Sequence, residues 1–145
     1  MVKATTYAND VLDHAYNGGA SGTAAIAAYT LPFKVKFLST LSTAATAGTE
    51  WATGGGYTQT AGGAVGGVSL SGNFSTPASG GSKANTAAVT VTNAPAGTWA
   101  DNEIVDSTTG TNKRMNFKGT PSLAKTVNAG DTCTIPIGSL TGQET

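Results

Sequence analysis

Charged residues are scarce in this sequence and are balanced in sign. Eight basic and eight acidic side chains give a formal net charge of zero over 145 residues. Such a chain has no long-range field with which to gather nucleic acid or an anionic membrane surface, so we expect partners to be recognised by shape. It also lacks an apolar run of membrane-spanning length, and its N-terminus does not resemble a signal peptide. These absences predict one soluble domain over residues 1–145.

Histidine and cysteine are nearly absent, which limits the available chemistry. His14 and Cys133 are the only residues of their types. A disulfide within the chain is excluded, and the usual His/Cys metal cages are not expected. The many Ser and Thr hydroxyls have only His14 as a candidate base, and Gly54-Gly55-Gly56-Tyr57 lacks the lysine of a phosphate-binding loop. We therefore predict no enzymatic activity, no catalytic residues, no cofactor and no metal.

One small cluster and the single cysteine leave an alternative open. Asp10, Asp13 and His14 lie within one helical turn and could bind a metal or move a proton, but they also form the polar face of an amphipathic helix, which we favour. Cys133 falls on the inward side of a predicted strand, where a thiol behaves as a small hydrophobic group.

Bulky aliphatic and phenyl side chains are also few. Leu, Ile, Val and Phe together number 24 of the 145 residues, below the one-fifth level at which a self-sufficient core becomes doubtful. Zero net charge and clear apolar patterning argue against disorder. We expect an ordered domain with a thin core that gains stability from neighbouring subunits.

Residues 4–17 carry the helix signal. Apolar side chains recur there at helical spacing, and Gly18-Gly19 follows as a terminator. We expect this helix to pack on a sheet through Tyr7, Val11 and Tyr16.

Beyond residue 30 the apolar period changes from helical spacing to two. Short alternating segments are separated by clusters of Gly, Pro and Asn, without the rhythm of alternating strands and helices. This pattern predicts a mainly β fold, an antiparallel β-sandwich or barrel over 31–145 with one N-terminal α-helix. The alternating segments are 33–37, 68–74, 87–92, 114–118 and 132–137.

Two further groups have a functional and a structural interpretation. A basic strip of sheet residues could meet an acidic surface or nucleic acid, but a solvated sheet face is favoured because no aromatic side chains interleave. Trp51, Tyr57 and Trp99 could bind sugar, yet large aromatic residues are more often core. The strip comprises Lys34, Lys36, Lys113, Arg114 and Lys118.

Several motifs resemble, in order along the chain, a family of small virion proteins of tailed bacteriophages. The clearest is the stretch 124–135, two β-type runs around the Asn128-Ala129-Gly130 turn, followed by Gly138-Ser139-Leu140-Thr141. The others are Asn9-Asp10-Val11-Leu12-Asp13-His14, the 48–57 element ending in Gly54-Gly55-Gly56-Tyr57, Asn85-Thr86-Ala87-Ala88-Val89-Thr90, Trp99, and Val105-Asp106-Ser107-Thr108-Thr109-Gly110.

Members of that family are described as capsid decoration (minor capsid) proteins or as tail-fibre proteins. The resemblance implies a decoration, or cement, protein on the capsid exterior that is made in the bacterial host cytoplasm. Its implied partner is the major capsid protein, and it is expected to act as a homotrimer without nucleic acid or membrane. Candidate intersubunit or capsid-facing residues are Tyr7, Val11, Tyr16, Trp51 and Tyr57. The alternative is a tail-fibre or tail-tip protein that binds a host surface glycan or protein.

One segment departs from the family pattern. Asp101, Asn102 and Glu103 stand where apolar residues are common in the family. We therefore expect a frayed or reassigned strand between Trp99 and Asp106.

Overall fold

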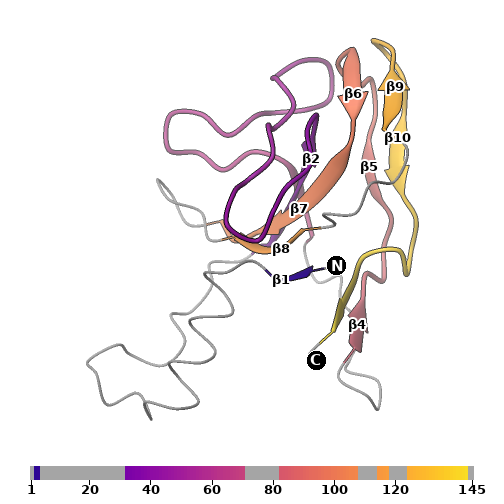
Figure 1. Ribbon diagram of the computed structural model, residues 1–145. Helices are drawn as coiled ribbons and strands as arrows, with labels where there is room; N and C mark the ends of the chain where they lie inside the picture. The colour runs from indigo at the N-terminus through magenta and orange to yellow at the C-terminus, as the bar shows by residue number, and fades with distance from the viewer. Residues whose placement is uncertain (1, 4–31, 71–81, 108–113, 118–123, 144–145) are drawn as a thin grey trace.

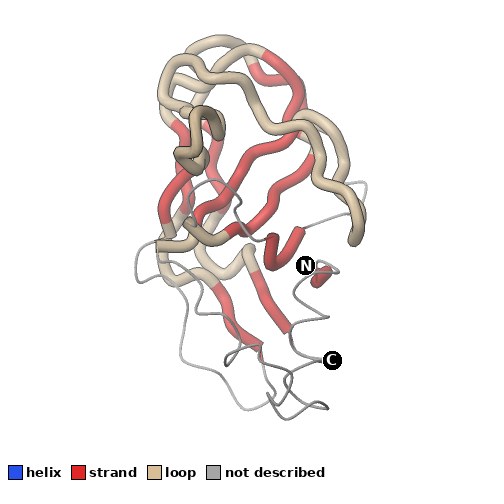
Figure 2. Tube along the Cα trace, turned by 90° about the vertical axis from the view of Figure 1, so that its left-hand side faces the viewer, coloured by secondary structure: helices blue, strands red, loops and turns tan. Residues whose placement is uncertain are grey.

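The structure of the chain is a computed structural model, which describes residues 2–3, 32–70, 82–107, 114–117 and 124–143 (Figure 1). Every regular element in these ranges is a β-strand, and no helix occurs in them (Figure 2). The prediction of a mainly β protein is confirmed at this level. The helix predicted at 4–17 lies outside the described residues.

The largest sheet has five strands in the order β1-β8-β7-β2-β3. All its pairings are antiparallel, as predicted, and the register of β2 on β7 runs from Lys34↔Val105 to Leu38↔Asp101. Its strands are β1 (Val2–Lys3), β2 (Lys34–Leu38), β3 (Val68–Ser69), β7 (Asp101–Val105) and β8 (Arg114–Phe117).

The remaining strands form three two-stranded pairs: β4–β11, β5–β10 and β6–β9. Together with β7–β8 these pairs are nested, so that 82–105 runs antiparallel to 114–117 and 124–143 as the two arms of one long ribbon. The added strands are β4 (Ser82–Ala84), β5 (Val89–Val91), β6 (Gly97–Trp99), β9 (Lys125–Val127), β10 (Cys133–Ile135) and β11 (Thr141–Gln143).

The ribbon is irregular between β5–β10 and β6–β9. On one arm Asn93 has a positive φ of 54°, and on the other Gly130 has a φ of 92°. Ala94 N donates to Asp131 O at 2.8 Å, and Gly130 N donates to Ala94 O at 3.0 Å. The predicted Asn128-Ala129-Gly130 turn is therefore present. It joins β9 to β10, yet these two strands pair with β6 and β5 and not with each other.

The Gly54-Gly55-Gly56-Tyr57 element packs against this irregular region. Gly56 N donates to Asn93 O at 2.8 Å. A Cβ atom on Gly55 would lie 1.7 Å from Asn93 O, and one on Gly56 would lie 1.9 Å from Thr92 O. Gly55 also has a φ of 54°, a conformation that glycine adopts without steric cost. The glycines are thus required by a close backbone approach.

Strand β7 corrects the expectation of a frayed strand between Trp99 and Asp106. It lies between β2 and β8, and all five of its residues are buried. Its polar side chains have partners: Asp101 Oδ2 accepts from Ser42 N at 2.9 Å, and Asn102 Oδ1 accepts from Trp99 Nε1 at 2.9 Å. These hydrogen bonds offset the cost of removing the polar groups from water. Polar residues can therefore be buried in this strand, where apolar residues are common in the phage family.

Two details of the predicted alternation are also wrong. In β2, Val35 and Phe37 are buried as expected, but Lys36 on the opposite side is only 8 % exposed. The strand is therefore covered on both sides. After β10 the alternation ends, because Ile137 lies beyond the strand, next to the Gly138 turn, and is 66 % exposed.

The core draws on the five-stranded sheet, the ribbon and the 51–57 loop. Val89 and Val91 of β5 and Cys133 and Ile135 of β10 face inward, as their alternation predicted. The other buried members are Val35, Phe37, Trp51, Tyr57, Leu70, Ala94, Ile104, Val127 and Leu140.

Candidate functional site

The five predicted contact residues divide into two groups. Tyr7, Val11 and Tyr16 lie outside the described residues, as do Asp10, Asp13 and His14. Trp51 and Tyr57 lie in the core, with 4 % and 2 % of their surface exposed. Packing within the subunit covers these two side chains, which leaves little of their surface for contact with a neighbouring subunit.

Four aromatic rings form one packed cluster beside β2. Phe37 lies 5.1 Å from Trp51 and 5.1 Å from Trp99 between ring centroids, and Tyr57 meets Phe37 edge-on at 6.1 Å. Trp51 Nε1 donates to Thr98 O at 2.7 Å. Tilted and edge-on pairs are the arrangements that aromatic quadrupoles favour. The cluster is a structural centre, and only Trp99 remains partly exposed at its edge.

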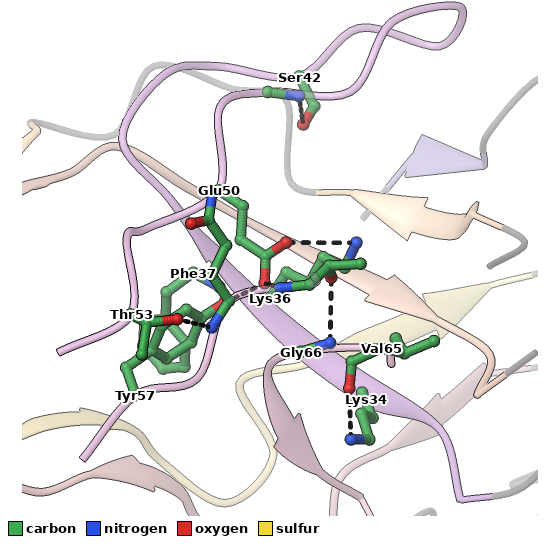
Figure 3. A network of polar contacts seen from close by, with 12 residues as sticks. Lys34, Lys36, Phe37, Ser42, Glu50, Thr53, Tyr57, Val65 and Gly66 are labelled. Carbon is green, nitrogen blue, oxygen red and sulfur yellow. Dashed lines mark hydrogen bonds and ion pairs between the residues drawn. The ribbon is translucent and has the colours of Figure 1, made fainter. Parts of the chain in front are cut away.

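Beside these rings, the Glu50 carboxylate makes polar contacts with strand β2 and with the 53–67 loop (Figure 3). Glu50 Oε1 accepts from the Tyr57 hydroxyl at 2.9 Å and from Thr60 N at 3.2 Å, while Oε2 lies 3.5 Å from Lys36 Nζ. Phe37 N in turn donates to the Tyr57 hydroxyl at 3.2 Å. Glu50 therefore fastens the 53–67 loop to strand β2.

The same network affects the ionisation of Tyr57. Burial raises the pKa of the phenol strongly, and the negative charge of Glu50 raises it further. Tyr57 is thus held neutral as a hydrogen-bond donor to the carboxylate.

The lysines of β2 do not form the solvated sheet face that we expected. Lys36 pairs with Glu50, and Lys34 Nζ donates to Val65 O at 2.6 Å (Figure 3). Both side chains are occupied by contacts to loops of the same chain. The side chains of Lys113, Arg114 and Lys118 lie outside the described part.

Cys133 is buried, as its position on the strand predicted. Burial raises the pKa of its thiol, the nearby Asp131 carboxylate acts in the same direction, and Lys125 opposes them. A protonated thiol is a poor nucleophile and a poor metal ligand. Within the described ranges, no group of three or more His, Cys, Asp or Glu side chains could hold a metal ion.

An open groove of about 400 Å³ lies where the ribbon is irregular. We call it the ribbon groove. Trp99 of β6 contributes one wall, and the C-terminal arm contributes the rest from both sides of the 128–131 turn. Its lining residues are Trp99, Lys125, Thr126, Val127, Asp131, Thr132, Cys133 and Thr134.

Charge and polarity in the ribbon groove are balanced. Lys125 Nζ lies over the Trp99 ring, 5.9 Å from its centroid. Asp131 Oδ2 accepts from Asn128 N at 2.8 Å. Val127 and Cys133 are buried, whereas the threonines on either side of them are exposed. The groove thus combines an aromatic ring and an apolar floor with hydroxyl, ammonium and carboxylate groups.

Sequence reasoning missed this groove. The stretch 124–135 stood out as a motif, and Trp99 stood out as an aromatic residue, but no sequence pattern connected them. The connection is the antiparallel register Trp99↔Lys125, which joins two residues separated by 25 intervening residues of sequence. Exposed threonines alternating with buried Val127 and Cys133 were the available signal.

Asn85, the first residue of the 85–90 motif, has a structural role in the fold. Its buried amide donates from Nδ2 to Ala87 O at 2.8 Å and to Pro136 O at 3.0 Å, and its Oδ1 accepts from Leu140 N at 2.9 Å. Gly138 N donates to the Asn85 carbonyl at 2.9 Å. Asn85 therefore ties the two arms of the ribbon together between β4–β11 and β5–β10.

No model of a known protein family matches the chain, and no curated protein matches it either. Within the described residues, the structure contains no helix that is long and apolar enough to cross a membrane.

Proposed function

We propose that this chain is a structural protein of a bacteriophage virion, a capsid decoration protein that binds the outer surface of the head and stabilises it. The proposal includes a β-sandwich over 31–145, an N-terminal helix at 4–17, assembly as a homotrimer, and the major capsid protein as partner. Tyr7, Val11 and Tyr16 are its proposed contact residues.

One observation supports this proposal most. Three of the segments that resemble the phage family help to close the β framework in the described part of the chain. Gly55 and Gly56 allow the approach to Asn93, Asn85 joins the ribbon arms, and Leu140 fills the core. Motifs used in this way specify a scaffold, as expected of a protein whose function is to assemble.

The chemistry of the described residues is consistent with a scaffold. The titratable groups in the core are engaged: Glu50 and Lys36 with each other, and Asp101 with backbone N–H groups. Many weak contacts on one shell add up through multivalency, so such a protein needs no deep pocket to hold a capsid together.

The test is binding to heads assembled without this protein. Purified protein should bind them saturably and raise their resistance to heat, and density for it should appear on the outer surface of the particle. Its mass in solution should be that of a trimer. Heads that are equally stable with and without the protein, together with specific binding to host cells, would contradict the proposal and favour the tail-fibre alternative.

A further inference from the structure

We propose that the ribbon groove is a binding site for a neutral saccharide. The inference concerns the isolated protein, and it does not depend on where the protein lies in a virion. It rests on the shape of the groove, on the kinds of group that line it and on their balance of charge.

The volume suits a small ligand. At about 400 Å³ the groove falls in the range of roughly 300–1,000 Å³ that is usual for small-molecule sites. Trp99 offers a ring that is anchored on its inner side by Phe37 at 5.1 Å and by Trp51 at 6.4 Å. The indole N–H is already engaged by Asn102, so the ring is fixed in orientation. Lys125 Nζ lies over the ring, 5.9 Å from its centroid, so a sugar that stacks its apolar C–H face on Trp99 displaces this exposed side chain from the ring.

The polar groups around the ring suit hydroxyls. Among the lining residues, Lys125 is a donor, Asp131 is an acceptor, and the Thr126 and Thr132 hydroxyls are each both, whereas the Thr134 hydroxyl is paired with the Thr90 hydroxyl at 3.2 Å. Asp131 uses Oδ2 in the turn with Asn128, and among the described residues Oδ1 has no hydrogen-bond partner. A polyhydroxylated ligand presents donors and acceptors in alternation, which matches this set.

The balance of charge narrows the class of ligand further. One ammonium and one carboxylate line the groove, so it gives no net preference for an anion or a cation. A phosphate or a sulfated sugar would place negative charge beside Asp131. We therefore assign a neutral saccharide.

The experiment is titration of the purified, isotope-labelled protein with four sugars, lactose, maltose, cellobiose and chitotriose, followed by NMR. We expect at least one to bind saturably with a Kd on the order of 1 mM. The Trp99 indole and the amides of 125–134 should shift, while the indole of the buried Trp51 should not.

A matched pair of variants tests the site itself. Thr126 and Thr98 are both exposed and lie directly opposite each other in the β6–β9 register, but only Thr126 lines the groove. Thr126→Val should weaken binding about threefold to tenfold, the effect of losing one hydrogen bond. Thr98→Val should change it less than about twofold. Lys125→Met, which removes the ammonium group but keeps an unbranched side chain, should also weaken binding.

Three results would overturn the proposal. One is the absence of a shift with all four sugars. Another is equal binding by the Thr126→Val and Thr98→Val variants. The third is saturation of the groove by a threonine-rich extended peptide when none of the sugars binds, which would reassign the groove to a protein partner.

Discussion

At the scale of the residue, Glu50 is the side chain with the most consequences. It is 10 % exposed and receives a phenol hydroxyl, a backbone N–H and an ammonium group. A carboxylate is suited to this place because it accepts several hydrogen bonds and carries the charge that Lys36 needs when it is buried.

Replacing Glu50 with Gln should lower the free energy of unfolding by about 1–3 kcal/mol. Gln retains an acceptor for Tyr57 and Thr60, but it leaves the Lys36 ammonium without its charged partner. Urea denaturation measures the loss. In the double variant Glu50→Gln, Lys36→Met the buried charge is absent, so the combined loss should be smaller than the sum of the single losses. Strict additivity would contradict the coupling.

Gly55 offers a second test at this scale, with Gly62 as its control. Both have a positive φ, 54° and 58°, but an added Cβ meets Asn93 O at Gly55 and meets nothing within 4 Å at Gly62. Gly62→Ala should cost about 1–2 kcal/mol from backbone strain alone. Gly55→Ala should cost about 3 kcal/mol or more, because the steric clash is added to the strain. Equal melting temperatures for the two variants would contradict the steric clash and show that the backbone at Asn93 moves away at little cost.

At the scale of the element, Asn85 holds the ribbon where its strands are interrupted. Asn85→Ala should destabilise the protein by about 3 kcal/mol, because the Leu140 N–H and two carbonyls lose their partner. Hydrogen exchange should become faster at the Leu140 amide. Asn128 also has a side-chain bond, but it is exposed, so Asn128→Ala serves as a control with a smaller effect. Unchanged exchange at Leu140 would contradict this role.

Strands were predictable from sequence where the alternation was regular, and the partners of those strands were not. Val89 and Val91, like Cys133 and Ile135, were placed correctly on the inward side. Strand β7 was not, because Asp101 and Asn102 are buried through bonds to Ser42 and Trp99 that no local pattern announces. Lys36 was misplaced for the same reason, since its burial depends on Glu50 in a distant loop. Periodicity reports the side on which a residue lies, while burial of a polar group depends on tertiary partners.

At the scale of the whole molecule, Tyr57 should make the stability of the protein decrease at alkaline pH. Its pKa is raised from 10.0 in the folded state, so the folded protein holds the phenolic proton that the unfolded chain releases. Stabilisation is fully present below pH 10 and should decrease as the pH rises above it. Denaturation midpoints between neutral pH and pH 11 measure this slope. Tyr57→Phe should be less stable at neutral pH but should show a shallower decrease above pH 10. Parallel curves for the two proteins would contradict it.

The nested ribbon also implies an order of folding. The outer pairs join residues far apart in sequence, such as Ala84 with Thr141 and Thr90 with Thr134. Closing such loops from an open chain is entropically costly and slow. If β7 meets β8 first, each further pair closes only the short stretch left by the pair before it. The ribbon would then zip outward, from β7–β8 through β6–β9 and β5–β10 to β4–β11. During synthesis the first arm must wait for the second, because β11, the partner of β4, follows all the other strands of the ribbon along the chain.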